Sequence, residues 1–324
     1  MSFFTDQIQS HKGSSPCLFY PMAPKMEISM TELLTDSKVQ ERVLTKIAHG
    51  YPVNAVIRMT ELWCEGASFG MSCTIADDSF PRLGDPICTE PQALADVKIP
   101  QIENKTTAPL IEAVRLAVPK IEKPLIIGVT GPFTLASVLN GVENIMMTCM
   151  TAPDQIHDFL SRITDYIIEY ISAYKSVGAA GIILAEPSAS MISPAMMEEF
   201  SNAYIQKIIK AVQDDTFSLI YHNCGAVNPH LKTISQLDAD AFHFGSDVDM
   251  GLALDILGKN KFVMGNVDPR LFITATPDEI EKQTTALLNT YGERDNWRLS
   301  TGCDLSPDSS MENVECFLQT ANRF

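Results

Sequence analysis

A histidine and a cysteine stand two residues apart in YHNCGAV, where His222 and Cys224 follow a short apolar run. Alternate residues of an extended segment share a face, so both side chains would leave the strand end on the same side. Cys303, in TGCD, follows another apolar run. One imidazole and two thiolates suit zinc, and three protein ligands leave a position open for chemistry. The residues therefore indicate a catalytic zinc site, and a buried, metal-free pair is the alternative.

Seven short apolar runs, several of them rich in β-branched residues, are candidates for the elements that position these side chains. Between them lie segments with helical spacing, over residues 154–178, 193–212 and 276–292. Alternation of strands and helices predicts a parallel sheet covered by helices. The seven runs are VNAVIRM near 53, PLIIGVT at 124, GIILA at 181, FSLIY at 217, AFHF at 241, FVMG at 262 and WRLST at 297.

The fold class that this order favours is α/β, a (β/α)8 TIM barrel with an N-terminal helical lead-in. Seven strands are one short of closure, and CTIADD, residues 73–78, is the candidate for the eighth. An open doubly wound sheet is the alternative, but GVTGPF has the wrong glycine spacing for a dinucleotide loop. We expect a single domain over 1–324, in which residues 1–50 form a helical N-terminal extension.

The composition restricts the partners. A net charge of -16 opposes binding to nucleic acid, and no apolar run is long enough to span a bilayer. The N-terminus does not read as a secretory signal, so we expect a cytoplasmic protein with no membrane partner. In a reducing compartment the eight cysteines are expected to be thiols or metal ligands.

Four stretches together resemble the uroporphyrinogen decarboxylase superfamily, and within it the cobalamin-dependent branch of methylcobamide:coenzyme M methyltransferases. They are PLIIGVTGPFTLASVL, YHNCGAVNPHL, FVMGNVDPRLFITATPDEIEK and LSTGCDLSPDSSMENVECFL. The resemblance runs from about Arg58 to the C-terminus. It implies an enzyme with a (β/α)8 barrel, in which zinc is held by His222, Cys224 and Cys303.

The function that this resemblance implies is transfer of a methyl group between a corrinoid and a zinc-activated thiol such as coenzyme M. The corrinoid, methylcobalamin, would arrive on a partner corrinoid protein. Among candidate catalytic residues, Glu186 could fill the open zinc position until the thiol displaces it. The alternative is a solvated carboxylate or an N-cap partner for the next helix. Glu65 could contact substrate or stabilise a helix end. Arg58, Arg82 and Arg270 are candidates for the sulfonate of coenzyme M.

Two other functions are alternatives to the methyltransferase. A uroporphyrinogen decarboxylase-like tetrapyrrole enzyme would share the fold, but it would grip many carboxylates with N-terminal arginines, and the first arginine here is Arg42. A non-catalytic, zinc-dependent corrinoid or thiol-binding module would use the same three ligands without turnover. A further histidine, His243, lies between two phenylalanines, and we expect it to be a satisfied core residue.

Overall fold

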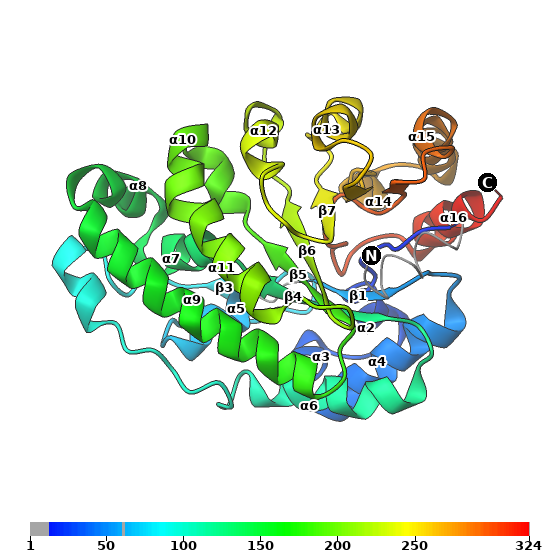
Figure 1. The fold of residues 1–324 in the computed structure, drawn as a ribbon. Helices are drawn as coiled ribbons and strands as arrows, with labels where there is room; N and C mark the ends of the chain where they lie inside the picture. Colours follow the sequence, from blue (N-terminus) through cyan, green and yellow to red (C-terminus); the bar gives the residue numbers. More distant parts are fainter. Residues whose placement is uncertain (1–12, 60–61, 324) are drawn as a thin grey trace.

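The computed structural model describes residues 13–59 and 62–323 and contains a curled, seven-stranded parallel sheet in the order β1-β4-β5-β6-β7-β8-β9 (Figure 1). All seven apolar runs contribute a strand, so this part of the prediction is confirmed. The strands are β1 (Val56–Arg58), β4 (Leu125–Thr130), β5 (Gly181–Ala185), β6 (Ser218–Asn223), β7 (Ala241–Phe244), β8 (Phe262–Met264) and β9 (Trp297–Arg298).

The eighth strand of the barrel does not lie at residues 73–78, so this prediction is wrong. Residues 73–78 contribute only β2 (Cys73–Thr74), which pairs antiparallel with β3 (Arg82–Leu83) in a separate small sheet. Instead, Ser14 forms parallel bridges to Val53, just before β1, and to Leu299, just after β9. The N-terminal segment therefore fills the gap between the two edge strands. Ser14 forms one bridge on each side and no longer ladder, and the apolar run of this segment, residues 17–20, begins only after Pro16.

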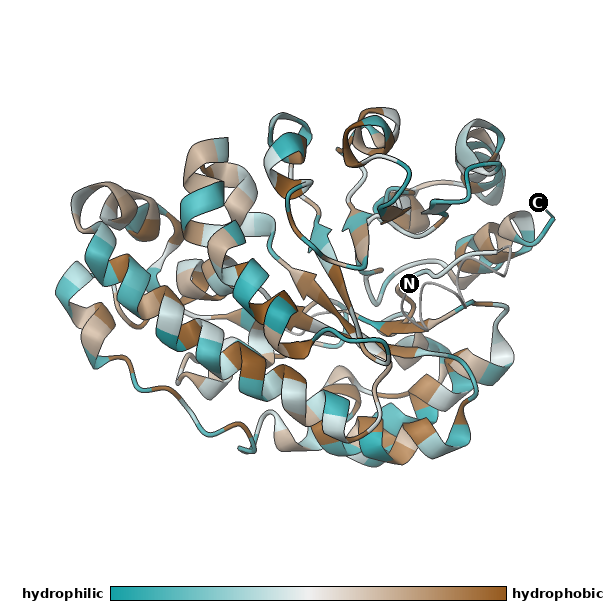
Figure 2. Ribbon diagram, viewed as in Figure 1, coloured by the Kyte–Doolittle hydropathy of each residue, from teal (hydrophilic) through white to brown (hydrophobic). Residues whose placement is uncertain are grey.

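Helices cover the outside of the sheet and turn their apolar faces inward, as the hydropathy colouring shows (Figure 2). The three long helical predictions are confirmed as α9, as α10 to α11, and as α15. The helices of eight or more residues are α4 (Ser37–Gly50), α6 (Ala108–Ala117), α7 (Pro132–Asn140), α8 (Val142–Thr151), α9 (Pro153–Ser176), α11 (Ala203–Val212), α13 (Met250–Leu257), α15 (Pro277–Tyr291) and α16 (Met311–Ala321).

Shorter helices occupy the connections. A π-helical turn, Glu198–Asn202, joins α10 to α11. The segment predicted as a lead-in contains α2, α3 and α4, and residues 1–12 of it lie outside the described residues. The shorter α-helices are α2 (Met22–Lys25), α3 (Met30–Thr35), α5 (Leu62–Ser68), α10 (Pro194–Met197), α12 (Leu231–Ile234) and α14 (Leu271–Thr274).

Side-chain caps fix where several helices begin. Ser193 accepts a hydrogen bond from the Met196 N–H at the start of α10, and Thr276 and Glu279 form a reciprocal capping box at α15. Asp36 caps α4 and separates it from α3. No helix in the described ranges is both long and apolar enough to cross a membrane.

Two apolar cores result from the alternation of side chains along each strand. The larger core lies between the sheet and the helices and includes Ile127 and Leu184. The smaller core fills the barrel interior with inward residues such as Ile126, Ile183 and Ile220. His222 follows Ile220 by two residues on β6, so its side chain enters the barrel at the carboxyl end of the strands, where barrel enzymes build their sites.

Candidate metal centre

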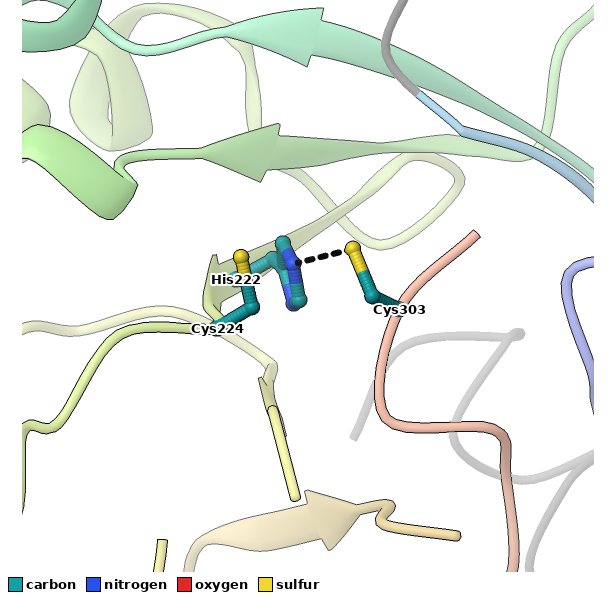
Figure 3. Close-up of side chains that lie close together, drawn as sticks. All are labelled: His222, Cys224 and Cys303. Atoms are coloured by element: carbon teal, nitrogen blue, oxygen red, sulfur yellow. Dashed lines mark hydrogen bonds between the residues drawn. The ribbon is translucent and has the colours of Figure 1, made fainter. Parts of the chain in front are cut away.

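His222, Cys224 and Cys303 converge at the carboxyl end of the barrel (Figure 3). Their ligand atoms all lie within 4.8 Å of one another, and the Cys303 Sγ is 3.8 Å from the His222 Nε2. A tetrahedral zinc ion separates such donor atoms by about 3.6 to 3.8 Å, given Zn–N near 2.0 Å and Zn–S near 2.3 Å. The donor set and its spacing therefore fit zinc, with one position left for a further ligand.

The three residues come from the end of β6 and from the loops after β6 and β9, and two glycines allow these segments to approach. His222 belongs to β6, Cys224 follows that strand, and Cys303 follows β9. A Cβ at Gly245, directly after β7, would lie 2.6 Å from the Cys224 Cα. A Cβ at Gly302 would lie 2.8 Å from the Ser246 backbone nitrogen. Because a side chain at either position would push these loops apart, the glycines hold the two cysteines near each other.

A chain of hydrogen bonds orients the imidazole of His222. Its Nδ1 is 3.1 Å from the His243 carbonyl oxygen and 2.7 Å from the His243 Nδ1. The His243 Nε2 is 3.0 Å from the Ser300 Oγ, whose hydroxyl donates to the Ser15 carbonyl at 2.7 Å. With His243 neutral, each group donates to the next, and the His222 Nε2 is left without a proton to face the ligand position.

His243 is the functional residue that the sequence prediction missed. It is fully buried, as expected, but its ring stacks at an angle against His222 and not only against core side chains. Burial, and then the charge of His222, hold the pKa of His243 well below its ordinary value, so the ring is neutral. The register between the strands would have predicted this contact, because His222 and His243 are paired neighbours on β6 and β7.

A hydrogen bond between the two thiols shifts their pKa values in opposite directions. A hydrogen bond from Cys303 lowers the pKa of Cys224 to about 4, with further help from His222. The same hydrogen bond, burial, and the charges of Cys224 and Asp304 raise the pKa of Cys303 well above its ordinary value. The pair thus favours ionisation of Cys224, and the charge of Asp304 opposes ionisation of Cys303.

The three ligands face a cavity of 270 Å³ whose walls are mostly apolar and aromatic. Tyr20, Trp63 and Phe80 contribute rings, and Asp304 contributes a carboxylate. Tyr20 belongs to the N-terminal segment, so this segment both closes the barrel and walls the pocket. No sequence pattern places Tyr20 and Phe80 at the site, because neither residue follows a strand of the barrel.

Glu186 lies next to the centre along the backbone, since its N–H donates to the His222 carbonyl at 2.9 Å. Its carboxylate, however, accepts hydrogen bonds from the N–H groups of Phe133 and Thr134 and from the Ser201 hydroxyl, all at 2.9 Å. Phe133 and Thr134 lie in the first turn of α7. Burial raises the pKa of Glu186, and these hydrogen bonds oppose the rise. The carboxylate is fully buried, so it is not a solvated group. It contacts the first turn of α7 and not the helix that follows it in the chain, so the expected capping partner was wrong.

Glu65 is also buried, and its carboxylate is hydrogen-bonded to the backbone of another element. Both of its carboxylate oxygens accept from the Thr130 N–H, at 2.9 and 3.2 Å, so α5 is tied to the end of β4. Neither Glu65 nor Glu186 belongs to the group of converging ligand atoms found in the described residues. Their predicted catalytic roles stay predictions, and the contacts point to positioning of α5 and α7.

The three candidate arginines do not line the 270 Å³ pocket. Arg58 is buried on the outer side of β1, where its guanidinium donates to the Gln40 Oε1 and the Tyr174 hydroxyl. Arg270 forms a bidentate pair with Asp268 in a different cavity. Arg82 lies exposed on β3.

Solved structures share this architecture over the whole chain. A methyltransferase from Methanosarcina mazei superposes with a TM-score of 0.88 at 19% identity, covering 100% of this chain and 99% of that one. A B12-independent methionine synthase from Shewanella sp. W3-18-1, in complex with selenomethionine, gives a TM-score of 0.64 at 13% identity over 91% of this chain and 88% of that one. At these identities the likeness establishes the fold.

Sequence comparison identifies the family. The uroporphyrinogen decarboxylase of Xylella fastidiosa is 22% identical over 290 residues, which cover 84% of this chain and 81% of that protein. The enzyme of the same name from Coxiella burnetii is 23% identical over 287 residues, covering 85% and 78%. The family model described as uroporphyrinogen decarboxylase (URO-D) matches residues 20–324. With nearly the whole chain matched, the protein belongs to the uroporphyrinogen decarboxylase (URO-D) family.

Proposed function

We propose that the protein is a zinc-dependent methyltransferase that moves a methyl group between a corrinoid and a thiol. The observation that supports this proposal most directly is the convergence of His222, Cys224 and Cys303 on one pocket at the carboxyl end of the barrel. The names of its relatives and structural neighbours are those of enzymes, and the 0.88 TM-score match is a methyltransferase. Zinc, the corrinoid and its carrier protein belong to the proposal.

The chain supplies the ligands and fixes their protonation. Zinc bound by the three residues would deprotonate a substrate thiol at neutral pH and hold the resulting sulfur nucleophile. His222 presents an unprotonated Nε2 because His243 accepts its Nδ1–H. Two cysteine thiolates cancel the charge of the ion, which keeps electron density on a third sulfur. Trp63 and Phe80 place apolar surface beside the ligand position, where it would reduce the access of water to the reacting atoms.

The reaction balances without a further reagent. The carbon–cobalt bond breaks and leaves its electron pair on cobalt, a carbon–sulfur bond forms, and the thiol proton is released to solvent. The corrinoid would cover the mouth of the pocket while a partner protein carries it. Because methyl transfer needs the sulfur and the methyl carbon in line, the open fourth position of the ligand set must face this mouth.

A decarboxylase is the rival within the family. Such an enzyme acting on a tetrapyrrole with many carboxylates needs cationic side chains in its pocket. Across residues 13–59 and 62–323, no lysine or arginine lines the cavity at His222. Decarboxylation also leaves the facing Cys224 and Cys303 without a task. These two observations favour methyl transfer.

A measurement of catalytic turnover distinguishes a methyltransferase from a zinc-dependent binding module. Purified, zinc-loaded protein is mixed with methylcobalamin and a panel of small thiols, and the corrinoid spectrum is followed under anaerobic conditions. We expect demethylation with at least one thiol, lost in Cys224→Ser and retained in Cys73→Ser, a control cysteine on β2 outside the ligand group. No demethylation with any thiol would leave binding without catalysis.

A further inference from the structure

We propose that Asn223 is the positioning residue that brings His222 and Cys224 onto one metal ion. Asn223 stands between these two ligands in the chain, and its side chain is fully buried. The inference rests on the zinc site of the proposed function, and it concerns how the metal is held and not how the methyl group moves. It comes from the hydrogen bonds that the Asn223 amide forms on both sides of the strand end.

A regular strand would hold the two ligands apart. Each residue of a strand rises by about 3.3 Å, so an extended continuation of β6 would separate the Cα atoms of His222 and Cys224 by about 6.6 Å. Their ligand atoms lie within 4.8 Å of each other, and the two side chains lie close together (Figure 3). The strand ends at Asn223, and the chain bends at Gly225. This bend helps the Cys224 sulfur to approach the His222 ring.

The Asn223 side chain stabilises the bend. Its Oδ1 accepts a hydrogen bond from the Gly225 N–H at 2.9 Å, and the Gly225 carbonyl accepts from the Val227 N–H at 2.9 Å. A hydrogen bond from an asparagine side chain to the backbone two residues later forms an Asx turn. Cys224 is the residue that this turn encloses, so the turn restricts the direction in which its thiol can point.

The nitrogen of the same amide holds the turn on the barrel. Its Nδ2 donates to the Glu186 carbonyl at 2.6 Å and to the Tyr221 hydroxyl at 3.1 Å. The Glu186 N–H donates to the His222 carbonyl at 2.9 Å, so the end of β5 holds both neighbours in the ligand strand. A flipped amide would place Oδ1 against the Glu186 carbonyl and a donor against the Gly225 N–H, so the contacts fix its orientation.

Glu186 extends this support to a helix. Its carboxylate accepts from the N–H groups of Phe133 and Thr134 in the first turn of α7. The loop that carries Cys224 is therefore tied to β5 and, through Glu186, to α7. Ligands that are held in place before the metal arrives bind it more tightly, because less conformational freedom is lost on binding. Asn223 is the side chain that connects this support to the loop.

Two substitutions separate the contacts of Asn223. Asn223→Ala removes all three hydrogen bonds, whereas Asn223→Ser keeps an oxygen that can accept from the Gly225 N–H and is too short to reach Glu186 or Tyr221. The zinc Kd, measured by competition with a chromophoric chelator, should rise about tenfold or more in Asn223→Ala and by less in Asn223→Ser. In Co(II)-substituted Asn223→Ala the sulfur-to-cobalt charge-transfer band should fall toward that of Cys224→Ser.

Asn313→Ala is the matched control for a loss of stability alone. Asn313 is also buried, and its amide donates to the carbonyls of Phe272 and Ala275 at 3.2 and 2.9 Å. Its substitution should lower the Tm, as Asn223→Ala does, and leave both the zinc Kd and the cobalt band unchanged. Wild-type zinc affinity in Asn223→Ala, or an equal loss of affinity in Asn313→Ala, would overturn the assignment.

A metal-free measurement keeps this test independent of zinc and of methyl transfer. Phenylarsine oxide forms an arsenic–sulfur bond to each of two close thiols and releases its oxygen as water. Mass spectrometry of the digested apoprotein gives the yield of the peptides bridged through Cys224 and Cys303, which should be lower in Asn223→Ala than in wild type or Asn313→Ala. An equal yield in all three would overturn the role of Asn223. If the expected order is found and no thiol is methylated, methyl transfer fails and the positioning role stands.

Discussion

The Nδ1 atoms of His222 and His243 lie 2.7 Å apart, on paired positions of the neighbouring strands β6 and β7. Only one of two ring nitrogens at this distance can carry the proton between them. The Ser300 and Ser15 contacts settle the direction, because Ser300 gives its hydroxyl hydrogen to the Ser15 carbonyl and so accepts from the His243 Nε2. His243 thus fixes the tautomer of His222, a proposed metal ligand, from inside the barrel.

His243→Ala should weaken zinc binding by about 10- to 100-fold, the usual cost of removing a hydrogen-bond partner of a metal ligand. The His222 ring would lose its orientation, while all three ligand side chains stay present. Competition with a chromophoric chelator measures the zinc Kd. His157→Ala removes a half-exposed histidine of α9 and is the control. Equal zinc affinity in wild type and His243→Ala would assign His243 to the core alone.

Glu186→Gln should lower the free energy of unfolding by about 1 to 3 kcal/mol and leave zinc content unchanged. An amide nitrogen cannot accept, so one N–H of the first turn of α7 would lose its partner. Chemical denaturation and elemental analysis of the same sample give both quantities. The exposed Glu198→Gln is the matched control. A fully folded Glu186→Gln protein that has lost its zinc would instead show that Glu186 is a ligand.

Gly245→Ala should separate the Cys224 loop from β7 and reduce zinc binding, because the new methyl group would meet rigid backbone 2.6 Å away. Gly50→Ala, at the end of α4, meets only the flexible Lys46 side chain at 3.7 Å and should be neutral or slightly stabilising. Zinc stoichiometry and Tm of the two variants provide the comparison. A Gly245→Ala variant with full zinc content would show that the loop moves freely.

The barrel strands could be read from the sequence because buried parallel strands are continuous apolar runs. The segment at Ser14, which closes the barrel, could not be predicted in this way. Ser14 forms only one bridge on each side, which needs no run of apolar residues, and Pro16 stands two positions later. For the site, strand ends predicted which side chains meet, and His222, Cys224 and Cys303 do meet. Side chains that act from an inward strand position, such as His243, carry no local signal, because the strand register decides their neighbours.

The sequence left a capping role for Glu186 open, but for the helix that follows it, and the structure shows the contact with α7. A carboxylate after β5 reaches the first turn of α7 only because β4 and β5 are adjacent, with Gly131 placed against Glu186. Such a contact joins residues more than fifty positions apart. The position of Glu186 after an apolar run therefore marked it as a candidate, but only the tertiary structure shows that its partner is α7.

X-ray absorption at the zinc K-edge tests the central claim most directly, namely that His222, Cys224 and Cys303 hold a zinc ion whose open position takes the substrate sulfur. We predict two sulfur neighbours at about 2.3 Å and one nitrogen at about 2.0 Å in the zinc-loaded protein. Addition of the thiol substrate should raise the number of sulfur neighbours from two to three. A spectrum without two sulfur neighbours, or a sulfur shell that no thiol changes, would contradict the account.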